Sequence, residues 1–154
     1  MKLSLFSLLS GALLAVAAPT SKVAARQQGQ AITRWDPVYD NPSTPLTATA
    51  CSDGENGLIN KGFNTIGDLP KQNGDIVIVA GATFTVGGWN SPSCGNCYKL
   101  EYDGRQVYAI AVDHASEGFV IGKNGLDILT NGRAEEAGSV QVTYTPVDAS
   151  QCGL

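Results

Sequence analysis

The stretch from residue 89 to residue 115 constrains the fold more than any other part of the chain, because it carries the signature of a β-hairpin. Tyr98 to Tyr102 is typical of a short strand. It is followed by Asp103-Gly104, a dipeptide strongly favoured in two-residue hairpin turns. Arg105 to Val112 then returns as a second, more apolar strand. We therefore predict a hairpin at the centre of the fold, with the other segments closing a small barrel around it.

The chain length and the charge distribution limit both the domain count and the class of partner. The 154 residues suffice for one hydrophobic core but not for two. From Trp35 onward there are 6 basic and 14 acidic side chains, a net charge of −8. Such a surface argues against nucleic acid and against an acidic membrane surface as partners. A neutral ligand such as a sugar polymer is compatible with it.

The N-terminus has the pattern of a secretion signal. Lys2 is followed by an apolar run from Leu3 to Val16 and by the small-residue pattern of a cleavage site at residues 15–17. This run is shorter than the roughly 18–20 residues that a membrane span needs. We expect a signal peptide at 1–17, a flexible lead-in or pro-segment at 18–31 and one domain at 32–154. The mature protein is then expected outside the cell and in the cell wall.

Secretion changes how the four cysteines are interpreted, because an oxidising compartment favours disulfides. The cysteines are Cys51, Cys94, Cys97 and Cys152, and they allow three pairings. Pairing Cys94 with Cys97 would close only a tiny loop, whereas pairing each with a distant cysteine closes long loops worth roughly 3–5 kcal/mol each. The C-x-x-C spacing also occurs in redox and zinc sites, but neither a βαβ frame nor a second C-x-x-C accompanies it. We expect two structural disulfides, no metal and no cofactor.

The remaining segments predict a mainly β fold. The expected strands, besides the central hairpin, are Ile32–Tyr39, Leu46–Cys51, Asp75–Gly81, Thr83–Val86, Phe119–Ile121 and the strictly alternating Ser139–Val147. The best helix is 124–131, with Asn124 as N-cap and Gly132 as the C-terminal stop, and Leu58–Leu69 has a broken helical face. Six or seven short strands with one or two short helices indicate a small β-barrel with crossed connections.

Six sequence words, in order, carry a family resemblance: RWDPVYDNPS, ACSDGENGLINKG, GGWNSPSCGNCYKLEYDGR, IAVDHA, LTNG and QCGL. They resemble the cerato-platanin family of small secreted fungal proteins, over about Ile32 to Leu154. The resemblance implies a six-stranded double-ψ β-barrel akin to that of expansins, and the pairings Cys51–Cys94 and Cys97–Cys152. The segment DHASEGFVIGKNGLDIL departs from the family's usual DHADGFNIS, so the loop after His114 differs in length or polarity.

The strand-end residue Asp113 is the first candidate for the site. It matches the family's strand-end aspartate, which lies where related hydrolase barrels carry their general acid. A carboxylate there can accept hydrogen bonds from sugar hydroxyls or, if protonated, donate to a glycosidic oxygen. The alternative is an aspartate that only caps its own turn. His114 is expected to be a loop residue that points to the opposite face.

Tyr39, Asp40 and Asn41 form a second candidate cluster, in which an aromatic face lies beside an amide and a carboxylate. This combination suits a shallow saccharide site, although a packed tyrosine followed by turn residues is the alternative. Asn90 and Ser91 are candidates to line the same groove, with the ordinary turn chemistry of Asn-Ser-Pro as the alternative. Trp89 is predicted to lie in the core rather than to serve as a binding platform.

These features favour a non-catalytic carbohydrate-binding protein over an enzyme. Glycosidic hydrolysis needs two carboxyl groups about 5–9.5 Å apart, and only Asp113 is well matched, so no catalytic residue is assigned. The expected partners are cell-wall polysaccharide or chitin oligomers, and the resemblance adds a plant host that recognises the protein as an elicitor. The alternatives are weak expansin-like or glycoside hydrolase activity that uses Asp113 as acid, and a surface-active, protein-binding effector without a saccharide site. We expect a monomer, with self-assembly at interfaces as the alternative.

Overall fold

The computed structural model describes residues 27–154, and the expected signal peptide lies outside the described residues. Six strands form one closed barrel in the order β1-β5-β2-β4-β3-β6. Their bounds are β1 Gly29–Trp35, β2 Val79–Ala82, β3 Cys97–Tyr102, β4 Arg105–Asp113, β5 Phe119–Ile121 and β6 Ser139–Val147. The pairs β1–β5 and β2–β4 are parallel and the other four are antiparallel, so the connections cross. The predicted six-stranded double-ψ barrel is confirmed.

The central hairpin is formed by β3 and β4, as the sequence predicts. Tyr102 pairs with Arg105 across the two-residue turn. Asp103 and Gly104 both have positive φ, at 47° and 74°. Two successive left-handed residues are the requirement of the turn that matches strand twist, which is why this dipeptide fixes the hairpin and its register.

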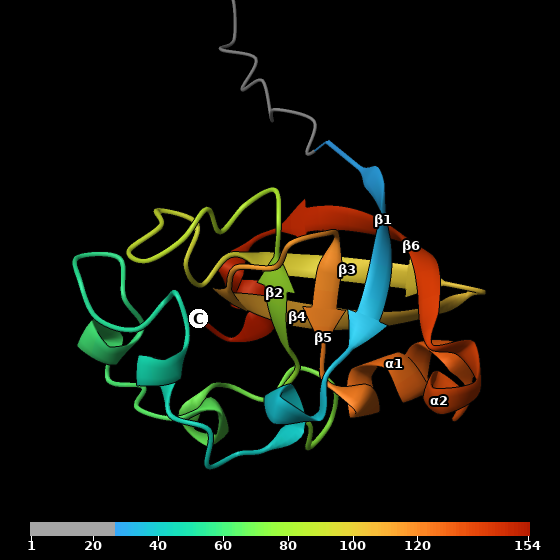
Figure 1. Ribbon diagram of the computed structural model, residues 1–154, viewed down its shortest axis with the longest axis horizontal. Helices are drawn as coiled ribbons and strands as arrows, with labels where there is room; N and C mark the ends of the chain where they lie inside the picture. The colour runs from blue at the N-terminus through green and yellow to red at the C-terminus, as the bar shows by residue number, and fades with distance from the viewer. Residues whose placement is uncertain (1–26) are drawn as a thin grey trace, which may run out of the picture.

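Short helices cover the barrel. The α-helices are α1 Lys123–Thr130 and α2 Ala134–Ala137, and the 3₁₀ helices are η1 Pro37–Asp40, η2 Leu46–Ala48, η3 Ile59–Lys61, η4 Ile66–Asp68 and η5 Ala149–Cys152. In Figure 1 the teal and green segments that contain η2 to η4, and the yellow-green loop between β2 and β3, lie to the left of the barrel, whereas α1 and α2 lie at its lower right. The hydrophobic core continues from the barrel into the 3₁₀ segments, since Leu46, Leu58 and Ile66 are buried in the same cluster as the strands.

Two disulfides cross-link the chain, with the pairing that the resemblance implies. Cys51 forms a disulfide with Cys94, and Cys97 at the start of β3 forms one with Cys152 in η5. The sequence separations are 43 and 55 residues. Each bridge closes a long loop, which restricts the unfolded chain strongly.

Several predicted elements are wrong. Leu46–Cys51 is not a strand, because the amide of Leu46 donates to the Asn64 carbonyl and the amide of Thr49 donates back to the Leu46 carbonyl, which closes a 3₁₀ turn. The Thr49 hydroxyl donates to the same carbonyl. Residues 83–86 form turns rather than a strand, and 58–69 holds only the short η3 and η4. The first strand covers 29–35 instead of 32–39, since Pro37 begins η1.

The main helix is predicted well at its C-terminal end and less well at its start. Asn131 adopts the left-handed conformation at the C-cap, and Gly132 follows it. At the other end the N-cap is Gly122, not Asn124, and Gly122 has no side chain with which to cap. The Asp40 carboxylate caps the helix instead: its Oδ1 and Oδ2 accept the amide of Asn124 at 3.2 and 3.3 Å.

Candidate functional site

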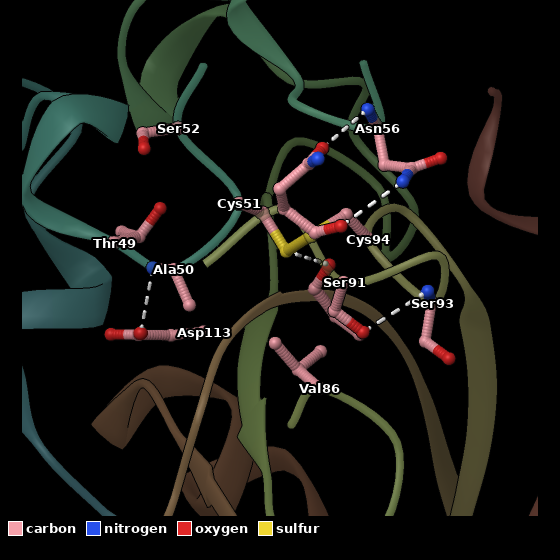
Figure 2. The surroundings of a disulfide bond; sticks show 12 residues. Thr49, Ala50, Cys51, Ser52, Asn56, Val86, Ser91, Ser93, Cys94 and Asp113 are labelled. Carbon is pink, nitrogen blue, oxygen red and sulfur yellow. Dashed lines mark hydrogen bonds between the residues drawn. A yellow bond between two sulfur atoms is a disulfide. The ribbon is translucent and has the colours of Figure 1, made fainter. Parts of the chain in front are cut away.

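The Asp113 carboxylate lies at the end of β4, half-buried, and is held by three donors from three parts of the chain. Its Oδ1 accepts the amide of Ala50 at 2.9 Å and the amide of His114 at 2.8 Å. Its Oδ2 accepts the hydroxyl of Tyr39 at 3.0 Å. Two carboxylate oxygens offer about four acceptor positions, and these bonds use two on Oδ1 and one on Oδ2. Figure 2 shows the carboxylate turned towards Ala50, beside the Cys51–Cys94 bridge.

Tyr39 supports this carboxylate from η1. The 3₁₀ turn is set by Asp36, whose carboxylate accepts the amide of Val38, and by Pro37 in its first position. Tyr39 is only 8% exposed, so its ring offers no open face for stacking. Burial, and then the neighbouring charge of Asp113, raise the pKa of Tyr39 well above its ordinary value, and it therefore remains a hydroxyl donor.

Asp40 does not join the cluster, although it follows Tyr39 directly. Its carboxylate points to the start of α1, as described above, and a Cβ on Gly122 would lie 2.2 Å from Oδ1. Burial raises the pKa of Asp40, and the α1 amides oppose the shift without cancelling it. The next residue, Asn41, is exposed and accepts the amide of Ser43 in an Asx turn.

Asn90 and Ser91 hold the loop between β2 and β3 against the chain near Asp113. The Asn90 amide donates to the Ala50 carbonyl at 3.2 Å, and its side-chain oxygen accepts the amide of Asn56 at 2.8 Å. Ser91 is 8% exposed and donates to the carbonyl of Thr85. Ala50 therefore bonds Asp113 through its amide and Asn90 through its carbonyl, so these two predicted site residues lie on either side of it.

His114 has a role in loop anchoring, as expected for a loop residue. Its Nδ1 lies 2.6 Å from the carbonyl oxygen of Val86. Because a carbonyl only accepts, Nδ1 carries the proton in this contact. The residue after Asp113 thus fixes the same loop that Asn90 ties to Ala50.

Trp89 is the residue that sequence reasoning placed wrongly. Its side chain is 64% exposed, and its Nε1 donates to Asp53 Oδ1 at 2.7 Å. The signals that could have placed it on the surface were the preceding Gly87-Gly88 pair and the polar turn that follows, because a turn offers little to cover an indole.

Within residues 27–154, no group of three or more His, Cys, Asp or Glu side chains could hold a metal ion. The helices of this described part are all too short or too polar to cross a membrane. A hollow of about 240 Å³ beside Asp40 is bordered by Ile66, Lys71 and Asn124, and it is separate from the contacts of Asp113.

Comparisons with known proteins agree with this architecture. The heat-stable 19 kDa antigen of Coccidioides posadasii is 46% identical over 149 residues, which covers 97% of this chain and 98% of the relative. The crystal structure of cerato-platanin 3 from M. perniciosa has a TM-score of 0.75 at 41% identity and covers 82% of this chain and 100% of its own. The solution structure of the fungal elicitor cerato-platanin has a TM-score of 0.69 at 32% identity and covers 79% and 95%. The family model described as Cerato-platanin matches residues 32–154, and the chain belongs to the cerato-platanin family.

Proposed function

We propose that this protein is a secreted, non-catalytic carbohydrate-binding protein of the fungal cell wall and surface. Its ligand is chitin or an N-acetylglucosamine oligomer, and the binding surface surrounds Asp113. The observation that carries the proposal is the half-buried Asp113 carboxylate, fixed by three donors with one acceptor position on Oδ2 left over. A preorganised acceptor of this kind binds a sugar hydroxyl without first having to be ordered.

Binding is favoured over hydrolysis because the site supplies one carboxyl group where a glycosidase needs two. The two groups must lie about 5–9.5 Å apart across the scissile bond. Asp40, the other candidate, accepts the amide of Asn124 at the start of α1. A general acid must also carry a proton, and both oxygens of Asp113 already face N–H or O–H donors.

Secretion, wall loosening and elicitation belong to the same proposal. Two disulfides are typical of proteins from oxidising compartments. A protein that competes for the hydroxyl groups of neighbouring polymer chains would loosen a wall without cleaving it. One related structure is that of a fungal elicitor, which supports a host receptor as a second partner.

The test is an NMR titration with an N-acetylglucosamine tetramer. The reporters are the amide protons of Ala50 and His114, since both donate to Asp113 and respond when a ligand hydroxyl shares the carboxylate. We expect both to shift at millimolar ligand. Unmoved amides at saturating tetramer would rule out this surface as the saccharide site.

Two variants make the titration specific. Asp113→Asn keeps an oxygen for the Ala50 amide but replaces the free acceptor, so affinity should fall. Asp103→Asn removes the same charge at the hairpin tip, roughly 26 Å away along the eight steps of β4, and Asn-Gly suits that turn equally well. It should bind like the wild type. Sustained release of reducing ends from chitin that Asp113→Asn abolished would overturn the non-catalytic assignment.

A further inference from the structure

We propose that Trp89 is a stacking platform for a sugar ring and extends the Asp113 surface to a second subsite. This inference rests on the proposed function, since it concerns another part of the same saccharide. The indole is the most exposed of the large apolar side chains in residues 27–154, at 64%, compared with 45% for Phe84 and for Val38. A single exposed apolar residue would need no explanation by itself, so the argument depends on how this one is held.

Both ends of Trp89 are fixed. On the side-chain end, Nε1 donates to Asp53 Oδ1 at 2.7 Å, and that oxygen also accepts the hydroxyl of Ser52, a residue only 6% exposed. On the backbone end, the following residue, Asn90, is bonded to Ala50 and Asn56. The ring is therefore restrained before any ligand arrives, which lowers the entropic cost of ordering it.

The fixed orientation leaves the faces of the ring, and not its polar edge, available to a ligand. Nε1 is already satisfied by Asp53, so the exposed area is aromatic surface beside a carboxylate. A pyranose ring presents the matching chemistry, with an apolar C–H face for the indole and hydroxyl groups for Asp53. Phe84 differs, because its ring is stacked on Tyr144 with centroids 4.7 Å apart and packs edge-on to Phe119. Phe84 is therefore partly exposed but packed against other aromatic rings.

The platform is close enough to Asp113 to act on the same oligomer. Asn90, next to Trp89, donates to the carbonyl of Ala50, and the amide of Ala50 donates to Asp113. Two residues, Asn90 and Ala50, and two hydrogen bonds thus connect Trp89 to Asp113. A ligand of several sugar units can contact both, so the tetramer should bind more tightly than the monosaccharide.

The experiment follows both tryptophan indoles while the mature protein is titrated with the N-acetylglucosamine tetramer. Trp35 is the internal reference, because its Nε1 donates to the Ala134 carbonyl on the α1–α2 side of the barrel. We expect the Trp89 indole N–H resonance to shift and the Trp35 resonance to stay. Trp89→Leu should raise Kd about tenfold, which corresponds to roughly 1.4 kcal/mol of lost stacking. Trp89→Phe keeps a smaller ring and should raise Kd by less.

Variants of Asp53 test the role of the anchor. Asp53→Ala frees the indole and should raise Kd several-fold, whereas Asp53→Asn keeps an oxygen acceptor for Nε1 and should restore most of the affinity. Phe84→Leu is the control, an exposed aromatic side chain outside this surface, and should leave Kd unchanged. The melting temperature of each variant shows that it remains folded.

The outcomes separate this inference from the proposed function. If the Ala50 and His114 amides shift but the Trp89 indole does not, and Trp89→Leu binds like the wild type, the platform is refuted and the Asp113 surface stands. If the indole shifts while those amides stay, the Asp113 surface is refuted and Trp89 binds sugar independently. If none of the three resonances moves, both proposals fail.

Discussion

The hydrogen bond between Tyr39 and Asp113 is the contact whose removal tests the architecture of the site most directly. Tyr39→Phe deletes the hydroxyl and leaves the ring in place, so the change in stability reports the bond itself. Hydrogen bonds to charged groups contribute about 1.5–3 kcal/mol. Asp113 is half-exposed and keeps the amides of Ala50 and His114, which reduces the expected loss. We expect Tyr39→Phe to lower the free energy of unfolding by about 1–2 kcal/mol.

A double-mutant cycle isolates this bond from other effects of the substitution. In an Asp113→Ala background the Tyr39 hydroxyl has lost its acceptor, so removing it should cost little or even stabilise. The coupling energy between the two sites should therefore also be about 1–2 kcal/mol.

Guanidinium unfolding at neutral pH, followed by tryptophan fluorescence with the disulfides intact, gives the four free energies of the cycle. For Tyr39→Phe the melting temperature should fall by roughly 3–8 °C. A coupling energy within about 0.3 kcal/mol of zero, the usual scatter for independent sites, would refute the reasoning. Asp113 would then be held by the backbone amides alone, and Tyr39 would be a packing residue.

Three further predictions concern the Tyr39 hydroxyl, the Asp40 helix cap and the Cys97–Cys152 bridge. Because the pKa of Tyr39 is raised in the folded state above the ordinary 10.0, its stabilisation is complete below pH 10 and is lost as the pH rises through the folded value. The stability difference between wild type and Tyr39→Phe should thus shrink by about 1.4 kcal/mol per pH unit above pH 10; a constant difference in alkaline unfolding curves would contradict it. Asp40→Ala should lower the free energy of unfolding by about 1 kcal/mol, because it removes the acceptor at the start of α1. Asp40→Asn should lower it by less, because the side-chain amide keeps an oxygen acceptor and no longer buries a charge. Equal losses in the two variants would argue against capping. Removing the bridge that closes 55 residues with Cys97→Ala and Cys152→Ala should cost about 4 kcal/mol, measured by denaturant unfolding, and a loss below about 2 kcal/mol would exclude the loop-entropy explanation.

The parts of the fold that the sequence predicts are those determined by local chemistry. Asp103-Gly104 predicts its hairpin because few other residues accept two successive positive φ angles. The alternation of Ser139–Val147 predicts β6 because one face of that strand is buried. The segment Leu46–Cys51 also alternates, but its small Thr and Ala residues fit a 3₁₀ turn equally well. The choice is made by Asn64, a distant residue that accepts the Leu46 amide.

The site shows the same division between local and distant causes. Asp113 could be placed at the end of β4 from the strand pattern and the family resemblance. The sequence could not distinguish Asp40 from Asp113. The direction of the Asp40 side chain depends on the space that Gly122 leaves by having no Cβ and on the amide that Asn124 offers at the start of α1. Two acidic residues that look equivalent in the sequence therefore have different surroundings: Asp113 is held by Tyr39, Ala50 and His114, whereas Asp40 caps a helix.

Trp89 shows why a residue's hydrophobicity alone is a poor guide to its burial in a loop. The prediction that Trp89 is buried assumed that burying the indole stabilises the folded state more than leaving it in solvent. Here the Cys51–Cys94 bridge and the Asn90 contacts fix the loop, and the Asp53 carboxylate satisfies the indole N–H at the surface. Covering the ring would require breaking those bonds, so the fold keeps it exposed. An aromatic face that the scaffold itself prevents from packing inwards is available only to a molecule that arrives from outside, which is why the oligosaccharide titration, and not a stability measurement, decides its role.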